Sequence, residues 1–296
     1  MSIDSKEIEL YKISLIKNQD WLDCRKHLEA LDNLFKECSD DEETKMLMEL
    51  ISRFMCPDED VFLTFYINQA KSIVNDGTIT VDNCIIGPTT DDEKPDSSQH
   101  MCNTFRNLLK RDGGGHIVTG HFHYVKNFIE DTKEKNIKVI ILDDFIGSGQ
   151  TMVVNIEICR ELVTRNEYTE GADFKVISFA AMEKGKQYIE GHCVEVIADC
   201  ILRKGITDFL AEPNLSAARS NMLRLESLIL EHSDHNYSFG YEQSEALYTK
   251  VITRTTNPIT SETDIFLDRA QDNVFPIFWW NKYINREPRK TLLYRD

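Results

Sequence analysis

The sequence predicts an α/β fold in which a mostly parallel sheet is flanked by helices, and three observations predict it. Residues 139–142 are a short apolar run without alternation, which is typical of a strand buried on both faces of a parallel sheet. A turn of small residues, Gly147 to Thr151, leads into a helical pattern over Met152 to Val163. A further strand at Lys175 to Met182 completes a right-handed crossover between parallel strands.

Length, composition and charge favour a globular protein with a sizeable core and disfavour membrane or nonspecific nucleic-acid binding. The 296 residues indicate one large domain or a domain with additions, and 41% hydrophobic residues suffice for a sizeable core. The net charge of −16 disfavours tight nonspecific contact with nucleic acid or an anionic membrane. The eight cysteines show no Cys-x-x-Cys, and no signal peptide or membrane-spanning run is present. We therefore expect reduced thiols, no zinc site, no membrane association and a cytoplasmic location.

The N-terminal quarter has helical spacing. Apolar residues recur from Cys24 to Phe35, and Ser39 with Glu42 forms a capping box for a second helix. A third helix is expected to start near Pro57 and to bury one face, with Val61, Phe62, Phe65, Ala70 and Ile73 on it.

The sheet begins after this helical region. Cys84 to Gly87 predicts its first strand, and a polar loop is expected from Thr89 to His100. A helix over Met101 to Lys110 follows.

Three glycines, residues 113–115, then interrupt the chain, and Ile117 to Val125 is predicted as a strand. His121 and His123 would point to one face of that strand, which is ligand geometry for a metal, but no third ligand with suitable spacing is visible. The alternative is that both histidines face solvent or a cleft.

The carboxyl-terminal third is predicted to contain a strand at Glu195 to Cys200 and a helix after Pro213. From Phe239 aromatic and polar residues are mixed. Trp279 and Trp280 fit either the packing of an edge strand or stacking against a base. Four basic residues close the chain and would suit an acidic partner or a nucleic acid: Arg286, Arg289, Lys290 and Arg295.

The turn after residues 139–142 is the predicted ligand-binding site. A strand, a small-residue turn and a helix place backbone N–H groups at the positive end of the helix, where a phosphate binds. Asp143 and Asp144 precede it, and carboxylates suit sugar hydroxyls or a Mg²⁺ held through oxygen ligands. Gln150 stands where a P-loop has lysine, and Met152 stands where a Rossmann turn has its third glycine.

This stretch, KVIILDDFIGSGQT, resembles the 5-phosphoribosyl-1-diphosphate (PRPP) loop of the type I phosphoribosyltransferases. The resemblance implies that Asp143 and Asp144 hold the ribose 2- and 3-hydroxyls, with an indirect hold on Mg²⁺. It also implies that Gly147, Ser148, Gly149, Gln150 and Thr151 wrap the 5-phosphate. Purine-type members carry an acid where this chain has Gly147, so the resemblance does not favour purine salvage.

The same resemblance suggests two further contributions to a site. Lys94, Ser97 and Ser98 occupy the place of the pyrophosphate loop, although the neighbouring acids fit a solvated surface loop equally well. Lys110 and Arg111, beside the glycines, are the candidates for a catalytic basic residue on a loop that closes over the reacting centre. A loose turn into the next strand is the alternative for those glycines.

The chain as a whole divides into a helical region (1–76), a phosphoribosyltransferase-like α/β core (77–238) and an aromatic-rich segment (239–296). Its last segment contains Gly240 to Tyr248, Arg254 to Pro258 and Val274 to Trp280. With the loop and the helical N-terminus, these resemble the phosphoribosyltransferase-like (PRTase-CE-type) effectors found beside bacterial anti-phage and retron modules.

That broader resemblance implies a function and its partners. The expected protein binds PRPP or a ribose 5-phosphate nucleotide with Mg²⁺ and makes or breaks a bond at the anomeric carbon. It is expected to be a defence effector, restrained by a protein partner and acting on nucleotides or nucleic acid on release. The alternatives are a non-catalytic nucleotide sensor or structural subunit, since a fold does not fix a function, and an ordinary salvage transferase.

Overall fold

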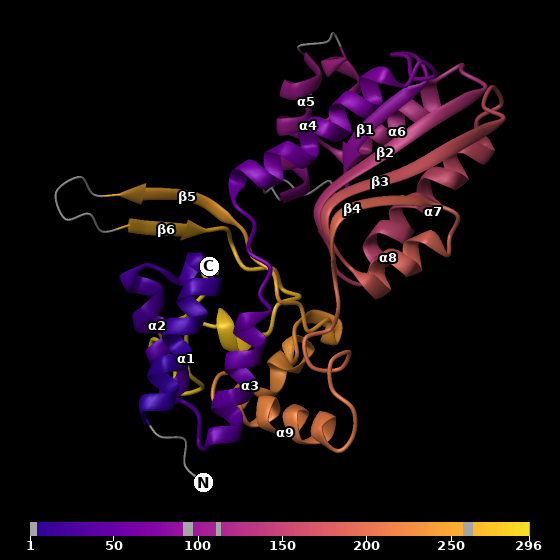
Figure 1. The fold of residues 1–296 in the computed structure, drawn as a ribbon. Coiled ribbons are helices and arrows are strands. Elements are labelled where there is room, and N and C mark those ends of the chain that lie inside the picture. The colour runs from indigo at the N-terminus through magenta and orange to yellow at the C-terminus, as the bar shows by residue number, and fades with distance from the viewer. Residues whose placement is uncertain (1–4, 91–96, 111–113, 257–262, 296) are drawn as a thin grey trace. The chain divides into compact units, whose positions relative to one another are not determined.

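The computed structural model describes residues 5–90, 97–110, 114–256 and 263–295 (Figure 1). Its helices and strands in chain order are α1 Ser5–Asn18, α2 Arg25–Lys36, α3 Asp41–Ser52, α4 Glu59–Asn75, β1 Cys84–Pro88, α5 Ser97–Lys110, α6 Phe122–Asp131, β2 Asn136–Ile146, α7 Gln150–Arg165, β3 Gly171–Met182, α8 Glu183–Glu190, β4 Glu195–Leu202, α9 Asn214–Glu226, β5 Val251–Thr256 and β6 Thr263–Leu267. Short 3-10 turns lie at Asp20–Leu22, Gly115–Ile117, His232–Tyr237, Tyr241–Gln243 and Pro276–Phe278.

The chain forms two compact units. Unit 1 combines Met1–Val61 with Arg203–Asp296, and unit 2 is Phe62–Leu202. This division differs from the three regions drawn from the sequence, because the N-terminal helices and the C-terminal segment belong to one unit. The chain thus enters unit 2 after Val61 and returns to unit 1 after Leu202.

Unit 2 contains a four-stranded sheet in the order β1-β2-β3-β4, with every neighbouring pair parallel. The predicted α/β fold with a parallel sheet is therefore confirmed. Residues 139–142 lie in β2, an interior strand, and are buried, as their unbroken apolar run predicts. The strands expected at Cys84, Lys175 and Glu195 correspond to β1, β3 and β4.

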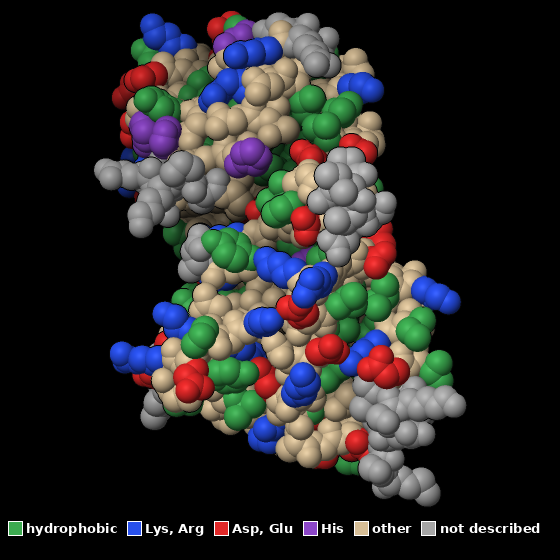
Figure 2. All heavy atoms as spheres, turned by 90° about the vertical axis from the view of Figure 1, so that its left-hand side faces the viewer, with side chains coloured by type: hydrophobic (Ala, Val, Ile, Leu, Met, Phe, Trp, Pro, Cys, Tyr) green, Lys and Arg blue, Asp and Glu red, His purple; other side chains and the backbone are tan. Residues whose placement is uncertain are grey.

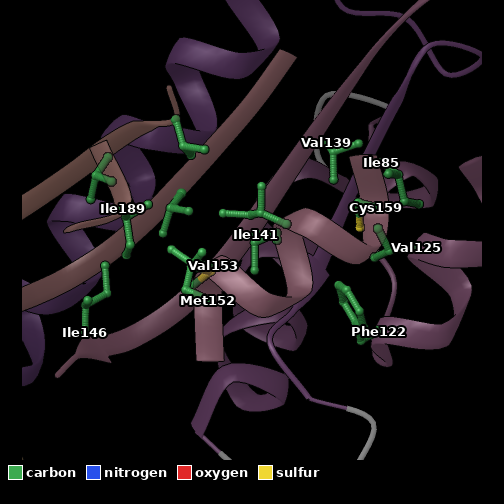
Figure 3. Close-up of a cluster of buried hydrophobic side chains, with 14 of the residues drawn as sticks. Ile85, Phe122, Val125, Val139, Ile141, Ile146, Met152, Val153, Cys159 and Ile189 are labelled. Atoms are coloured by element: carbon green, nitrogen blue, oxygen red, sulfur yellow. The ribbon is translucent and has the colours of Figure 1, made fainter. Parts of the chain in front are cut away.

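One face of the sheet packs against α6, α7 and α8 (Figure 1). Figure 3 shows Val139 and Ile141 of β2 beside Met152, Val153 and Cys159 of α7. These α7 residues recur at intervals that place them on one side of a helix. The three residues 147–149 connect the carboxyl end of β2 to the first turn of α7.

The opposite face of the sheet is covered by α4 and α5 through aromatic contacts (Figure 1). The ring centroids of Phe62 and Phe179 are 5.0 Å apart, and those of Tyr66 and Phe105 are 6.1 Å apart. Edge-to-face and tilted packing of this kind adds to the stabilisation from burial alone. The prediction that Phe62 and Phe65 are buried is confirmed, whereas Val61 is 51% exposed.

The N-terminal helices differ from the predicted ones in two respects. Helix α1 was not predicted. The cap of α3 lies one residue later than expected, because the Asp40 carboxylate accepts from the N–H groups of Glu42 and Glu43. Ser39 instead donates its N–H and its hydroxyl to Glu43.

Unit 1 is held together by contacts between the two ends of the chain. The N–H of Met55 donates to the carbonyl oxygen of Leu247 at 2.9 Å, and Thr249 N–H donates to Met55 at 3.0 Å. Arg289 pairs with Glu37 through both carboxylate oxygens, each at 2.7 Å.

The side chains near the chain's end have internal roles. Trp279 is buried and donates its Nε1–H to the Val274 carbonyl oxygen at 2.9 Å. It lies just after a 3-10 turn rather than on the edge strand considered above. Lys290 pairs with Glu29, and Arg295 with Asp272.

Unit 1 contains a buried carboxyl group, Glu226. It is 2% exposed and accepts from the Ser238 hydroxyl at 2.6 Å and the Phe239 N–H at 3.0 Å. Burial, assisted by the negative charge of Glu245, raises the pKa of Glu226 from 4.5 to about 7, although Arg219 opposes this rise.

Because the pKa of Glu226 is higher in the folded state, its contribution to the free energy of unfolding is fully present below pH 4.5. We predict that this contribution is lost as the pH rises to about 7. The loss should be on the order of 3 kcal/mol. Glu226→Gln should therefore flatten the pH dependence of the urea midpoint in this interval, whereas the exposed Glu231→Gln should not. An unchanged slope for Glu226→Gln would contradict the assignment.

The cysteines and the helices bear on the expectations drawn from composition. All eight cysteines are free thiols, and burial raises the pKa of Cys159 to about 12. Within the described part of the chain, no helix is both long and apolar enough to pass through a bilayer.

Candidate functional site

Asp143 and Asp144 lie near the carboxyl end of β2, where parallel sheets of this kind place their ligands. Pro88, the last residue of β1, pairs with Leu142. Asp143 therefore lies just beyond the end of the neighbouring strand, and its side chain is half-buried. Asp144, which follows on the other face of the strand, is only 1% exposed. The structure thus presents one of the two predicted carboxylates at the surface and encloses the other.

Hydrogen bonds fix the position of Asp143. Its Oδ1 accepts from the N–H of Asp144 at 2.9 Å, and its Oδ2 accepts from the Thr89 hydroxyl at 3.4 Å. Its backbone carbonyl accepts from the Tyr66 hydroxyl at 2.9 Å. Burial, followed by the charges of Asp144 and Asp143, raises the pKa of Tyr66 well above its usual value, so the phenol remains a donor.

Thr89, which follows β1, connects Asp143 to helix α7. The side-chain amide of Asn155 donates to the carbonyl oxygen of Thr89 at 2.5 Å, and Thr89 in turn contacts Asp143. Sequence reasoning missed Thr89, Asn155 and Tyr66 as supporting residues. Tyr66 lies in α4, far from the turn in sequence, and Asn155 lies within α7. Neither residue belongs to a local sequence motif.

The turn between β2 and α7 has the predicted strand–turn–helix form. Gly149 adopts φ +79°, a left-handed conformation that glycine tolerates best, and it immediately precedes the first residue of α7, Gln150. Gly149 offers no side chain to cap the helix, and the Ser148 hydroxyl accepts from the Gln150 N–H at 3.4 Å. Gln150 and Thr151 are exposed. The first two residues of this 16-residue helix are therefore exposed, and a helix N-terminus is a favourable place for an anion.

Helix α8 lies directly behind this turn. A Cβ at Gly149 would be 2.8 Å from the carbonyl oxygen of Gly185 and 2.9 Å from Cγ1 of Ile189. A Cβ at Gly185 would overlap the carbonyl oxygen of Gly147. The backbone of the turn thus depends on a glycine in the first turn of α8, which the sequence alone did not reveal.

Other residues predicted for the site lie elsewhere or outside the described ranges. Ser97 and Ser98 form the first turn of α5 and not the predicted loop, because the helix begins at Ser97 and buries Ser98. Lys110 is the exposed last residue of α5. Lys94 and Arg111 fall outside the described residues.

The strand predicted over Ile117 to Val125 is wrong. Val118 makes a single parallel bridge to Ile86, and α6 begins at Phe122. His121 precedes the helix and His123 lies in its first turn, with their rings stacked at 5.5 Å between centroids. Among the described residues, no three His, Cys, Asp or Glu side chains are grouped to hold a metal.

A search of curated proteins found no match. Among solved structures, an orotate phosphoribosyltransferase from Aeropyrum pernix is similar over 48% of this chain and 72% of its own, with 11% identity and a TM-score of 0.29. The UMP synthase of Leishmania donovani is similar over 55% of this chain and 33% of its own, with 13% identity and a TM-score of 0.30.

A hypothetical protein from Neisseria gonorrhoeae with bound ppGpp is similar over 50% of this chain and 85% of its own, with 14% identity and a TM-score of 0.30. The family model named PRTase-CE matches residues 3–295, which include both units and the turn after β2. The chain is therefore phosphoribosyltransferase-like and belongs to the PRTase-CE family.

Proposed function

We propose that the protein binds a phosphoribosyl ligand, either PRPP or a ribose 5-phosphate nucleotide, at the carboxyl end of β2. The observation that carries the proposal is the succession of a half-buried carboxylate, Asp143, a left-handed glycine, Gly149, and the start of α7. A carboxylate accepts hydrogen bonds from sugar hydroxyls, and a helix N-terminus binds phosphate. A sugar phosphate carries both groups in one ligand.

The structure supports different roles for the two acids in this proposal. Asp143 is the carboxylate that a ribose could contact directly. Asp144 is enclosed, so we expect it to act through the strand and the electrostatics of the site and not by contact with the ligand.

The donor set also fits Mg²⁺. This ion is commonly bound by one or two carboxylates together with water and substrate phosphates, and Asp143 with the adjacent Thr89 hydroxyl offers oxygen ligands of this kind. When bound, Mg²⁺ would neutralise charge on a pyrophosphate group. The protein's own contribution would be to hold the 5-phosphate at α7 and to orient the ribose with Asp143.

We propose that the reacting position is the anomeric carbon of this ligand. In PRPP its bond to pyrophosphate would break as a bond to an acceptor or to water forms, and pyrophosphate would leave; in a nucleotide the glycosidic bond would break and the base would leave. We further propose that the protein is the effector of a retron-type anti-phage system and acts on nucleotides or nucleic acid when a protein partner releases it. This setting is supported by the resemblance of residues 240–280 to such effectors.

Asp143→Asn should weaken binding of PRPP with Mg²⁺ by roughly 10–100-fold, because one charged hydrogen-bond acceptor is lost, worth about 1.5–3 kcal/mol. Asp144→Asn is the matched control and should weaken affinity less, because its side chain is enclosed. Titration calorimetry measures both, and thermal melting checks the fold. Equal PRPP affinity in the wild type and in Asp143→Asn would overturn the proposed site.

A second arm of the experiment addresses turnover. Gly147 replaces the purine-type acid, and the core carries a helical addition before it and an aromatic-rich segment after it that resembles a defence effector. We therefore expect the isolated chain to form little or no nucleoside monophosphate from PRPP and adenine, guanine, hypoxanthine, uracil or orotate at ordinary enzymatic rates, about 1 per second. Chromatographic detection of such a product would support ordinary salvage instead. Binding without turnover under all conditions, partner included, would support a nucleotide sensor.

A further inference from the structure

Unit 2 has an open pocket whose lining shares no residue with Asp143 to Thr151. It has a volume of about 760 Å³ and lies between α5 and the chain that leads from the turn at Gly115–Ile117 into α6. The polar residues that define it are Gln99, His100, Asn103, Arg106, His116 and His121. A volume of this size accommodates a nucleotide.

Among the described lining residues, Arg106 carries a positive charge and no residue carries a negative one. No Asp or Glu belongs to the lining within the described residues, although the chain carries 50 acids and a net charge of −16. Two other large pockets both contain acids, such as Glu29 in unit 1 and Asp173 in unit 2. Figure 2 shows histidine side chains, in purple, on the side of unit 2 that carries α5. Among the described residues, an anion entering this pocket meets hydrogen-bond donors and no carboxylate of the lining.

The guanidinium of Arg106 is held in place by two contacts. Its Nε donates to the carbonyl oxygen of Val118 at 3.1 Å, and its Nη1 donates to Oδ1 of Asn103 at 3.0 Å. A Cβ at Gly120 would lie 3.6 Å from Nη2 and in ordinary contact at most, so the space beside Nη2 is open. A fixed guanidinium beside open space is suited to a phosphate.

Aromatic rings lie next to these donors. The buried side chain of Gln99, 7% exposed, contacts Nδ1 of His121 from its Nε2 at 3.2 Å, which orients the imidazole. The centroids of the His121 and Tyr124 rings are 6.1 Å apart, and Tyr124 is 51% exposed. Oriented rings at the edge of an open pocket provide a surface on which a planar base can stack.

From these features we propose that the pocket binds a nucleoside phosphate, with the phosphate at Arg106 and the base against the rings of His121 and Tyr124. The three histidines in the lining do not form a metal site, since the described residues contain no grouping of three such ligands. An isolated phosphate would make no use of the rings. The nucleotide accounts for both the donors and the rings, and it binds independently of the ligand proposed at Asp143.

The decisive variant is Asn103→Asp. The new carboxylate keeps the oxygen that accepts from Arg106 Nη1, so the local structure should persist, but it adds a negative charge to the pocket. Asn107→Asp is the matched control, because it adds the same charge one turn later on α5, at an exposed position outside the lining. Gly120→Val fills the open space beside Arg106 by volume alone.

Calorimetry at 0.15 M salt with ATP, GTP, AMP and inorganic phosphate would measure binding to each variant. We expect the wild-type chain to bind at least one nucleotide more tightly than phosphate. Asn103→Asp and Gly120→Val should each weaken this binding about tenfold or more, and Asn107→Asp should change it less than about twofold. Nucleotide binding at the pocket should persist when the site at Asp143 is saturated with PRPP and Mg²⁺, and Asn103→Asp should leave PRPP affinity unchanged.

Three results would overturn the proposal. They are the absence of nucleotide binding at millimolar concentration, equal effects of Asn103→Asp and Asn107→Asp, and loss of the same binding when PRPP and Mg²⁺ saturate the site at Asp143. The last result would place the nucleotide at the carboxyl end of β2 and would support the proposed function while refuting the second site. If PRPP fails to bind but Asn103→Asp still weakens nucleotide binding, the second site stands without the first.

Discussion

Replacing Arg289 by methionine is expected to destabilise unit 1 by about 3–5 kcal/mol, because the Glu37 carboxylate would remain buried without its cation. The side chains of Arg289 and Glu37 are only 1% and 7% exposed. Arg289 also donates to the carbonyl oxygens of Trp280 and Ile277 at 3.0 and 2.7 Å. Methionine keeps an unbranched side chain, so the loss of packing should be small.

Tryptophan fluorescence measures this effect in unit 1 alone. The chain's three tryptophans, Trp21, Trp279 and Trp280, all belong to that unit. Lys290→Met is the matched control, because Lys290 pairs with Glu29 at 2.9 Å while their side chains are 65% and 43% exposed. Removing such a surface pair should cost about 1 kcal/mol or less.

The double variant Glu37→Gln with Arg289→Met should recover part of the stability lost in Arg289→Met, because no buried charge is then left unpaired. If urea unfolding gives the same midpoint shift for Arg289→Met and Lys290→Met, the buried pair does not hold the two ends of the chain together.

Gly185→Ala is expected to reduce PRPP affinity by about 100-fold or more. A Cβ at this position overlaps the carbonyl oxygen of Gly147, so the turn between β2 and α7 must move. A displacement of about 1 Å in a preorganised site has effects of this size. Gly185 lies in α8 and is not among the proposed ligand contacts. A loss of PRPP affinity in this variant would therefore show that binding depends on the position of the turn.

Gly191→Ala provides the comparison for Gly185→Ala. It lies just after the other end of α8, where a Cβ would be 3.4 Å from the nearest atoms, an ordinary contact. Calorimetry with PRPP should find Gly191→Ala close to wild type, and circular dichroism should show that both variants keep their helices. Wild-type affinity in Gly185→Ala would mean that the turn is not where the phosphate binds.

The strand and turn of the candidate site could be predicted because the necessary information is local. Residues 138–151 contain an unbroken apolar run, two acids and a glycine-rich turn. The apolar run indicates a buried strand, and the glycines indicate a turn. The exposure of the two acids could not be predicted in this way. Asp143 is accessible because β1 ends at Pro88, which is a property of the strand register and not of the turn itself.

The error at Ile117 to Val125 has a different cause. Its apolar residues fit a short strand, but Phe122, Val125 and Ile129 have helical spacing, and the helical pattern continues to the end of α6. A short window cannot decide between the two periods. Burial of these three residues against α7 and the sheet selects the helix.

Contacts between residues distant in the sequence could not be predicted, because no local pattern marks them. Gly185 appears as an unremarked residue early in α8, yet its lack of a Cβ permits the backbone of the turn to approach. Glu37 and Arg289 lie near opposite ends of the chain, and no periodicity links them. The single unit made from both ends was therefore drawn as two separate regions.

The construction of unit 1 from both ends of the chain has a consequence for biosynthesis. Helices α1 to α3 leave the ribosome first, but their partners, including Arg289, follow only after all of unit 2. At roughly 5–20 residues per second, the interval between Val61 and Arg289 is about 10–50 s. During translation the parallel sheet can fold while the apolar faces of α2 and α3 stay uncovered, so the nascent N-terminal segment should be the part of this protein that recruits chaperones.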